Sequence, residues 1–106
     1  MTEQYQVIVQ SQMGPRTGVL TLSYQEPYVT GSLGLVGYVN SVQGIRSEDG
    51  RLHLFHPIKT AVSTIPCETV LNIQAGNLFG ISISKSVRMR WEGALLRRES
   101  RELSKQ

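Results

Sequence analysis

The sequence Ile45-Arg46-Ser47-Glu48-Asp49-Gly50-Arg51-Leu52-His53-Leu54-Phe55 lies near the middle of the 106-residue chain and carries its strongest tight-turn signal. Asp49-Gly50 is typical of a type I′ hairpin turn, in which both central residues need φ > 0. We therefore predict a β-hairpin here, at or near the junction of two related halves of the chain.

Apolar and polar residues alternate along most of the remaining chain, as at Tyr5 to Val9 and at Val87 to Trp91. A period of two is the pattern of half-buried strands. About eight such runs follow one another, with connections too short for a parallel crossover. These features predict an all-β fold, an antiparallel up-and-down barrel of about eight strands, because closure removes exposed sheet edges. A β-sandwich of the same strands is the alternative.

Two sets of sequence offsets indicate four-strand pseudo-repeats at about residues 4–44 and 52–93. The first set lies 51 residues apart and comprises Pro15 and Pro66, Val19 and Val70, Leu20 and Leu71, and Leu22 and Ile73. The second lies 49 residues apart and comprises Gly31 and Gly80, and Gly44 and Gly93. We assign the two-residue difference to the connection between Leu22 and Gly31, because surface loops tolerate deletions.

Charge is concentrated at the end of the chain. The formal total is +3, but residues 1–84 carry −1 and residues 85–106 carry +4. We expect a single barrel domain at residues 1–93 and a basic C-terminal tail at residues 94–106. Arg98 and Glu102 have helical spacing, so this tail is expected to form a short helix or to be disordered.

The composition predicts a cytoplasmic protein. The N-terminal residues lack the basic and apolar regions of a signal peptide. Cys67 is the only cysteine, so no intramolecular disulfide is expected. No run approaches the roughly 18 apolar residues of a membrane span.

The chain resembles small bacterial calycin-like barrel domains, the class that includes lipocalins and avidins. The resemblance rests on the turn Met13-Gly14-Pro15, the strand Gly18 to Leu22 and the strand Gly31-Ser32-Leu33. It covers most of residues 4–93 and implies a calycin-like fold. It transfers no catalytic residue, and the Gly-x-Trp signature of lipocalins is absent, since Trp91 is the only tryptophan.

No combination of residues predicts catalysis or a metal centre. His53 and His56 are three residues apart, which places them on opposite faces of a regular strand. Cys67 has no base on its own strand, and no serine lies in a nucleophile-elbow sequence. Asp49 is expected to hold the turn backbone. We therefore expect no enzyme activity, no metal and no cofactor.

An eight-stranded barrel is wide enough to be filled by its own side chains or to hold one small ligand. We interpret the aromatic and aliphatic residues of the alternating faces as the lining, and we favour a filled or nearly filled barrel. The candidate ligand-binding residues are Tyr5, Leu20, Leu22, Leu33, Tyr38, Leu54, Leu71, Ile81, Met89 and Trp91, with Val7 and Phe55 beside them. They predict a small apolar or amphipathic ligand in the barrel or at its mouth.

Two other classes of function remain open. The run from Val62 to Ile73 has a single charge, so an exposed edge there favours a homodimer or a protein-interaction domain. The arginines of the C-terminal segment are compatible with nucleic-acid binding. We do not expect that function, since no strand combines aromatic and basic residues on one face.

Overall fold

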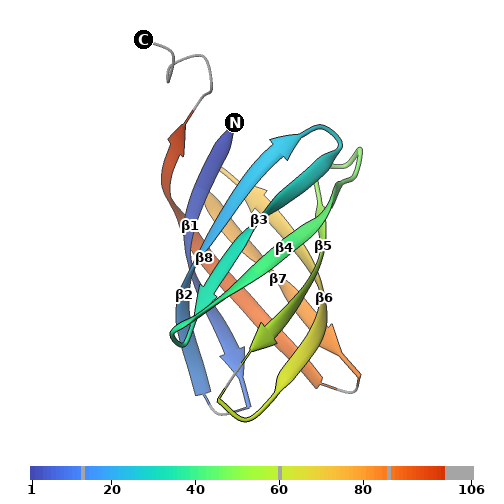
Figure 1. Ribbon diagram of the computed structural model, residues 1–106. Helices are drawn as coiled ribbons and strands as arrows, with labels where there is room; N and C mark the ends of the chain where they lie inside the picture. The colour runs from blue at the N-terminus through green and yellow to red at the C-terminus, as the bar shows by residue number, and fades with distance from the viewer. Residues whose placement is uncertain (13, 60, 86, 100–106) are drawn as a thin grey trace.

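The computed structural model describes residues 1–12, 14–59, 61–85 and 87–99. These residues form eight β-strands joined by short connections (Figure 1). The strands are β1 (Thr2–Ser11), β2 (Gly14–Gln25), β3 (Tyr28–Leu35), β4 (Tyr38–Arg46), β5 (Leu52–Lys59), β6 (Thr64–Gln74), β7 (Asn77–Ser84) and β8 (Val87–Glu99).

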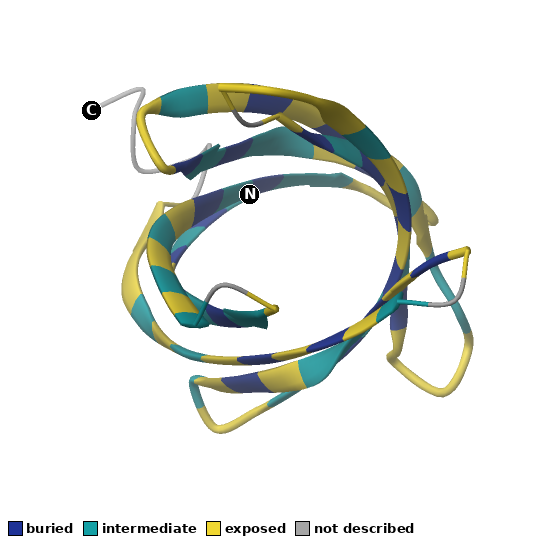
Figure 2. Cartoon of the chain, turned by 90° about the horizontal axis from the view of Figure 1, so that it is seen from below, coloured by how far each residue is buried: buried dark blue, intermediate teal, exposed yellow. Residues whose placement is uncertain are grey.

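The eight strands form one closed antiparallel barrel in which each strand pairs with its neighbours in the sequence. Closure is made by β1 and β8, from Thr2 opposite Glu99 to Gln10 opposite Arg90. Figure 2 shows the closed ring from below. The predicted up-and-down barrel is confirmed, and the alternative β-sandwich is wrong. Strand β6 is paired on both sides, so the edge that favoured a homodimer does not exist.

Buried and exposed residues alternate along each strand, because successive side chains point to opposite faces of the sheet (Figure 2). The buried side chains form a single cluster inside the barrel. Its largest members are Trp91, Tyr5, Leu20, Leu22, Leu33, Leu52, Leu54, Leu71 and Leu78. The middle of the barrel is therefore filled with side chains.

Inward-facing glycines stand where neighbouring strands approach closely. A Cβ atom at Gly31 would lie 1.8 Å from the carbonyl oxygen of Thr21, and one at Gly44 would lie 1.9 Å from that of His53. Only glycine leaves room for these strand pairs. The sharply coiled sheet of a small barrel explains their presence inside strands.

The connection around Asp49-Gly50 joins β4 to β5 as predicted, but its turn type differs. Gly50 has φ of 88°, whereas Asp49 is not among the residues with positive φ. The Gly50 N–H donates to the Ser47 carbonyl and the Ser47 N–H donates to the Arg51 carbonyl, which makes a longer loop than a two-residue turn. The type I′ prediction is wrong here. The Asp49 carboxylate accepts the Arg51 N–H at 3.1 Å, as predicted.

The strand registers relate the two halves of the barrel by 49 residues in three of four pairings, namely β1–β2 with β5–β6, β2–β3 with β6–β7 and β3–β4 with β7–β8. The fourth pairing differs by two residues or more, because Gly44 lies opposite Leu54 whereas Gly93 lies opposite Val7. Leu22 lies opposite Gly31 and Leu71 lies opposite Gly80, while Val42 and Trp91 occupy the next strand at the same offset. The offset of 51 therefore joins positions that are not equivalent in the barrel. The β2–β3 and β6–β7 connections each have two residues, so the expected length difference is absent. A common origin of the two halves stays a prediction.

Strand β8 is longer than expected and contains a bulge. Residues 94–99, which we expected in the tail, continue β8 and pair with the start of β1. Tyr5 lies opposite Leu95 and Gln4 opposite Arg97, so Leu96 has no partner on β1. The rest of the expected tail, residues 100–106, lies outside the described residues, as does Met13 of the predicted turn.

Candidate binding site

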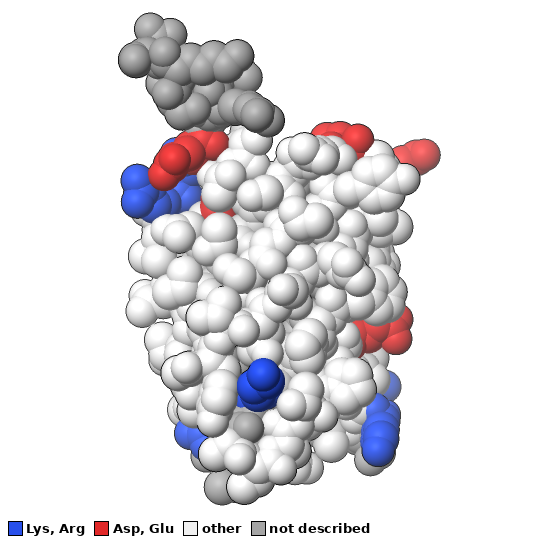
Figure 3. All heavy atoms as spheres, viewed as in Figure 1, with Lys and Arg blue, Asp and Glu red and all other residues white. Residues whose placement is uncertain are grey.

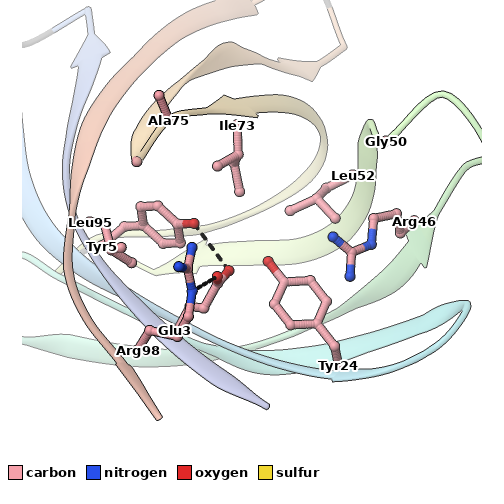
Figure 4. A pocket seen from close by; sticks show the side chains of 11 residues that line it. Glu3, Tyr5, Tyr24, Arg46, Gly50, Leu52, Ile73, Ala75, Leu95 and Arg98 are labelled. Atoms are coloured by element: carbon pink, nitrogen blue, oxygen red, sulfur yellow. Dashed lines mark hydrogen bonds and ion pairs between the residues drawn. The ribbon is translucent and has the colours of Figure 1, made fainter. Parts of the chain in front are cut away.

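A pocket of about 450 Å³ lies at the end of the barrel that is uppermost in Figure 1. We call it the mouth pocket, and Figure 4 shows its side chains. It lies beside the start of β1, the end of β8 and the β4–β5 and β6–β7 connections. Its lining residues are Glu3, Tyr5, Tyr24, Arg46, Gly50, Leu52, Ile73, Ala75, Gly76, Leu95 and Arg98.

The mouth pocket has a polar side and an apolar side, and the 49-residue relation explains this division. The first half of the chain places polar side chains in the pocket, whereas the second half places aliphatic side chains at the equivalent positions. The equivalent pairs are Glu3 and Leu52, Tyr24 and Ile73, and Arg46 and Leu95. Arg98 adds a second guanidinium group to the polar side.

Glu3 is the buried centre of the polar side, with 6% of the residue exposed. One carboxylate oxygen accepts the Tyr5 hydroxyl at 3.0 Å and the other accepts Arg98 Nε–H at 2.7 Å (Figure 4). Burial raises the pKa of Glu3, but the Arg98 hydrogen bond and the Tyr24 and Tyr5 hydroxyls outweigh it and lower that pKa below its ordinary value. Glu3 is therefore a paired carboxylate at neutral pH.

The β8 bulge determines which arginine meets Glu3. In a regular strand Arg97 would follow Leu95 on the inward face. The extra residue, Leu96, shifts the alternation, so Arg98 lies opposite Glu3. Arg97 instead pairs with Glu99 at 3.0 Å, and both of those side chains are exposed.

Arg46 lies at the pocket edge on β4. Its guanidinium carbon is 4.3 Å from the centre of the Tyr24 ring, a cation–π contact. Its Nη2 also pairs with the exposed carboxylate of Glu26 in the β2–β3 connection. The Glu26 hydrogen bond raises the pKa of Arg46, so the group is a permanent cation.

The two tyrosines are neutral hydrogen-bonding groups at neutral pH. Burial, together with the neighbouring Glu3 charge, raises the pKa of Tyr5 to about 12. Burial and the same carboxylate raise the pKa of Tyr24 as well. Both hydroxyls therefore stay protonated at neutral pH, and neither supplies a phenolate base. The mouth pocket therefore offers fixed charges, neutral hydroxyls and an aliphatic wall.

The ten predicted ligand-binding residues are not gathered at one site. Tyr5 alone lines the mouth pocket. Six of them fill the middle of the barrel, namely Leu20, Leu22, Leu33, Leu54, Leu71 and Trp91. Met89 lies at the lower end of the barrel in a separate apolar pocket of about 170 Å³, and Tyr38 begins β4 at that end.

Ile81 and Phe55 face outward, which corrects the expected lining. On β7 the inward positions are held by Leu78, Gly80 and Ser82, so the alternating Phe79, Ile81 and Ile83 lie on the outer face. Phe55 is 51% exposed on the outer face of β5. Alternation identified the two faces of these strands, but it did not identify which face is buried.

The sequence contained a weak signal for part of the mouth pocket. Glu3 is in phase with Tyr5, Val7 and Val9, so it is a carboxylate on an otherwise apolar face. Tyr24 is likewise in phase with the buried Leu20 and Leu22. Arg98 gave no such signal, because its inward position depends on the bulge.

The polar interior of the second half is a chain of four side chains. The Trp91 Nε1–H donates to Ser82 Oγ at 2.7 Å, the Ser82 and Thr69 hydroxyls are hydrogen-bonded, and Thr69 Oγ1 lies 2.6 Å from His56 Nε2. His56 Nδ1 lies 3.1 Å from the Pro57 carbonyl, which can only accept. This contact assigns the proton to Nδ1 and leaves Nε2 as the acceptor from Thr69.

Burial lowers the pKa of His56, so the neutral ring is the form that the interior holds. His53 lies on the opposite face of β5, as its spacing predicts. Burial raises the pKa of the Cys67 thiol. Within the described ranges, no three His, Cys, Asp or Glu side chains gather as metal ligands.

Comparison with protein-family models, curated proteins and solved structures finds no match. The described part of the chain contains no helix that is long and apolar enough to cross a membrane. What is established is a small, closed, eight-stranded antiparallel β-barrel with an amphipathic pocket at its upper end.

Proposed function

We propose that this protein is a non-enzymatic binding module that takes a small amphipathic molecule into the mouth pocket. The observation that carries the proposal is the divided lining of that pocket. Glu3, Tyr24 and Arg46 form one side, and Leu52, Ile73 and Leu95 form the other. Ligand sites typically combine apolar walls with a few placed polar groups in cavities of about 300–1,000 Å³, and this pocket falls within that range.

The filled core favours the mouth of the barrel over its centre as the binding position. Tyr5, Leu20, Leu22 and Trp91 are each at most 1% exposed and block the path from the pocket to the lower end. A ligand therefore has its polar part near Glu3 and Arg46 and its apolar part against the aliphatic wall. The resemblance to calycin-like barrels implies the fold alone and stays a prediction.

The polar groups of the mouth pocket support binding more than turnover. The carboxylate of Glu3 is held by Tyr5 and Arg98, and its lowered pKa makes it a poor proton donor near neutral pH. The raised pKa values of the tyrosines keep both hydroxyls protonated at neutral pH, so no phenolate is present to act as a base. These groups are well suited to hold a ligand in one orientation.

Native mass spectrometry of the protein purified from its natural host, followed by thermal shift with a panel of amphipathic molecules, tests the proposal. The variant Ile73→Trp fills the pocket from its apolar side, and Val39→Trp places the same side chain on the outer face, where Val39 is 76% exposed. We expect a co-purifying small molecule and ligand-induced stabilisation that Ile73→Trp abolishes and Val39→Trp retains. Equal stabilisation of both variants would contradict the proposal.

A protein-interaction or homo-oligomeric module is the second candidate, and the outer surface favours it. Between Thr17 and Ile45 the only charged residue is Glu26. On the face seen in Figure 3, the described charged side chains lie mainly toward the two ends of the barrel. Light scattering during size-exclusion chromatography tests this candidate: a dimer that Val39→Asp dissociates would support it, and a monomer at high concentration would contradict it.

The structure weakens the case for nucleic-acid binding. Arg98 is paired with Glu3 and Arg97 with Glu99, so two of the basic residues counted in the C-terminal segment already have carboxylate partners. Arg88 and Arg90 are exposed on the outer face of β8, beside Glu92. Arg101 and Lys105 lie outside the described residues.

A further inference from the structure

We infer that the polar head of the bound molecule is an anion, and that Arg46 binds it by exchanging its present partner, the carboxylate of Glu26. The inference rests on the proposed function, since it names the chemistry of the ligand at the same pocket. The class of ligand is an organic acid: a carboxylate, or a comparable oxyanion, joined to an apolar body.

The charges of the lining favour an anion. The mouth pocket is lined by one carboxylate, Glu3, and by two guanidinium groups, Arg46 and Arg98, which gives the lining a net charge of +1. The Glu26 carboxylate, which pairs with Arg46, lies outside the lining and balances this charge until a ligand replaces it. Each oxygen of Glu3 already accepts one hydrogen bond, and the residue is almost fully buried. Few acceptors therefore remain for a cationic or donor-rich head.

The remaining hydrogen-bonding capacity consists mainly of donors. Arg98 contacts Glu3 through Nε, and Arg46 contacts Glu26 through Nη2. A guanidinium group has five N–H donors, so each arginine keeps donors that these contacts do not use. Planar donor groups of this kind match the two oxygens of a carboxylate.

The two arginines differ in how readily their partners are replaced. The Glu3 side chain is 8% exposed in its pair with Arg98, whereas the Glu26 side chain is 57% exposed in its pair with Arg46. An exposed ion pair contributes little to stability, because water solvates both partners well. Glu26 is therefore the carboxylate that an incoming acid displaces.

Tyr24 keeps Arg46 in place during the exchange. The guanidinium carbon lies 4.3 Å from the centre of its ring, and this contact does not involve Glu26. Figure 4 shows Arg46 and Tyr24 side by side at the pocket, across from Ile73 and Ala75. The anion-binding group is thus positioned before the ligand arrives, which reduces the entropic cost of binding.

A cationic head is the opposite possibility, because tyrosines and a carboxylate often surround ammonium groups. Here Arg46 already stacks on the face of the Tyr24 ring, and Arg98 already forms an ion pair with the carboxylate of Glu3. A second cation would meet two guanidinium groups at short range. The geometry therefore disfavours it.

Isothermal titration calorimetry at pH 7 with octanoate, 1-octanol and octyltrimethylammonium tests the inference, because the three probes share one tail. We expect octanoate to bind at least about tenfold more tightly than 1-octanol, the order expected for a charged hydrogen bond. Its affinity should fall as ionic strength rises. Octyltrimethylammonium should bind most weakly.

Three variants test the exchange. Glu26→Gln removes the competing carboxylate and should raise octanoate affinity several-fold while leaving 1-octanol unchanged. Glu48→Gln is the matched control, because Glu48 is an exposed carboxylate of the β4–β5 connection that has no ion pair within the described residues, and it should change neither affinity. Arg46→Met should lower octanoate affinity by about tenfold or more and keep 1-octanol binding.

The outcomes separate the inference from the proposed function. Equal binding of octanoate and 1-octanol, or preference for octyltrimethylammonium, overturns the anionic head and leaves the proposed function standing. Unchanged octanoate affinity in Glu26→Gln overturns the exchange. Absence of binding by all three probes to the wild type counts against both. If Arg46→Met unfolds, Glu26→Gln still decides, since Glu26 is exposed.

Discussion

At the scale of single residues, the buried carboxylate of Glu3 organises the upper end of the barrel. It joins β1 to β8 through Arg98 and fixes the hydroxyl of Tyr5. A buried charge is stable only when it is paired and hydrogen-bonded. The contacts of Glu3 therefore stabilise both the closure of the barrel and the polar side of the pocket.

The contribution of the Glu3–Arg98 pair to stability can be measured by comparing alanine variants of Arg98 and its neighbour Arg97. Arg98→Ala leaves Glu3 buried without its ion-pair partner, so we expect a loss of about 1–3 kcal/mol in the free energy of unfolding. Arg97→Ala removes only an exposed pair with Glu99 and should cost less than about 1 kcal/mol. Urea unfolding measures both values. Equal losses of unfolding free energy in the two variants would show that the buried Glu3–Arg98 pair contributes no more than the exposed Arg97–Glu99 pair.

The stability of the protein should depend on His56 at mildly acidic pH. The pKa of His56 is lowered by burial, so the unfolded chain takes up a proton at a higher pH than the folded protein. The contribution of neutral His56 to the free energy of unfolding is therefore fully present above the pKa of about 6.5 that the residue has in the unfolded chain. This contribution is lost as pH falls below that value, by up to about 1.4 kcal/mol per pH unit. Protonation also makes His56 Nε2 a donor to Thr69, which leaves one hydroxyl proton of the Thr69–Ser82 pair without an acceptor among these side chains.

Urea unfolding between pH 8 and pH 5 measures this dependence. The slope should be present in the wild type and much smaller in His56→Gln, which keeps a polar side chain at this position. Glu3 affects the stability in a separate, more acidic pH range. Because its pKa is lowered in the folded protein, its contribution to the free energy of unfolding is lost only as pH falls below about 4.5. A wild-type stability that is flat from pH 8 to pH 5 would be inconsistent with a neutral, buried His56.

At the scale of the strand, alternation in the sequence was enough to predict the barrel but not its details. Runs such as Val87 to Trp91 showed one buried and one exposed face, and the structure confirms this for β8. The inward face of β7 was missed because it carries serines in place of large apolar residues. Ser82 is buried through its hydrogen bonds to Thr69 and Trp91, which residue type alone does not reveal.

Because β3 approaches β2 more closely at Gly31 than at Gly34, we expect alanine substitutions at these two glycines to differ in their effect on stability. Gly31→Ala would place a methyl group against the Thr21 backbone, so we expect it to cost about 1–3 kcal/mol, as overpacking does. At Gly34 the nearest atom to a new Cβ is 3.9 Å away, so Gly34→Ala should be neutral or slightly stabilising. Thermal unfolding of the two variants measures the difference. Similar melting temperatures would contradict this account of strand spacing.

At the scale of the whole molecule, the relation between the two halves generates the site. The 51-residue matches, such as Pro15 with Pro66, were coincidences of residue type, whereas the glycine matches followed the real spacing of 49. The mouth pocket could not be predicted from the sequence, because it depends on registers between distant strands and on the bulge at Leu96. Only Tyr5 was common to the predicted lining and the pocket.

The central claim is that a ligand binds at the mouth of the barrel and not in its filled interior. Nuclear magnetic resonance of ¹⁵N-labelled protein, titrated with octanoate, tests this most directly. We expect the backbone amide signals of Glu3, Tyr24, Arg46 and Leu95 to shift together and to saturate, while those of Val9 and Ile58 at the lower end stay in place. Saturable shifts centred on the lower end, or no shift at any amide, would contradict the account.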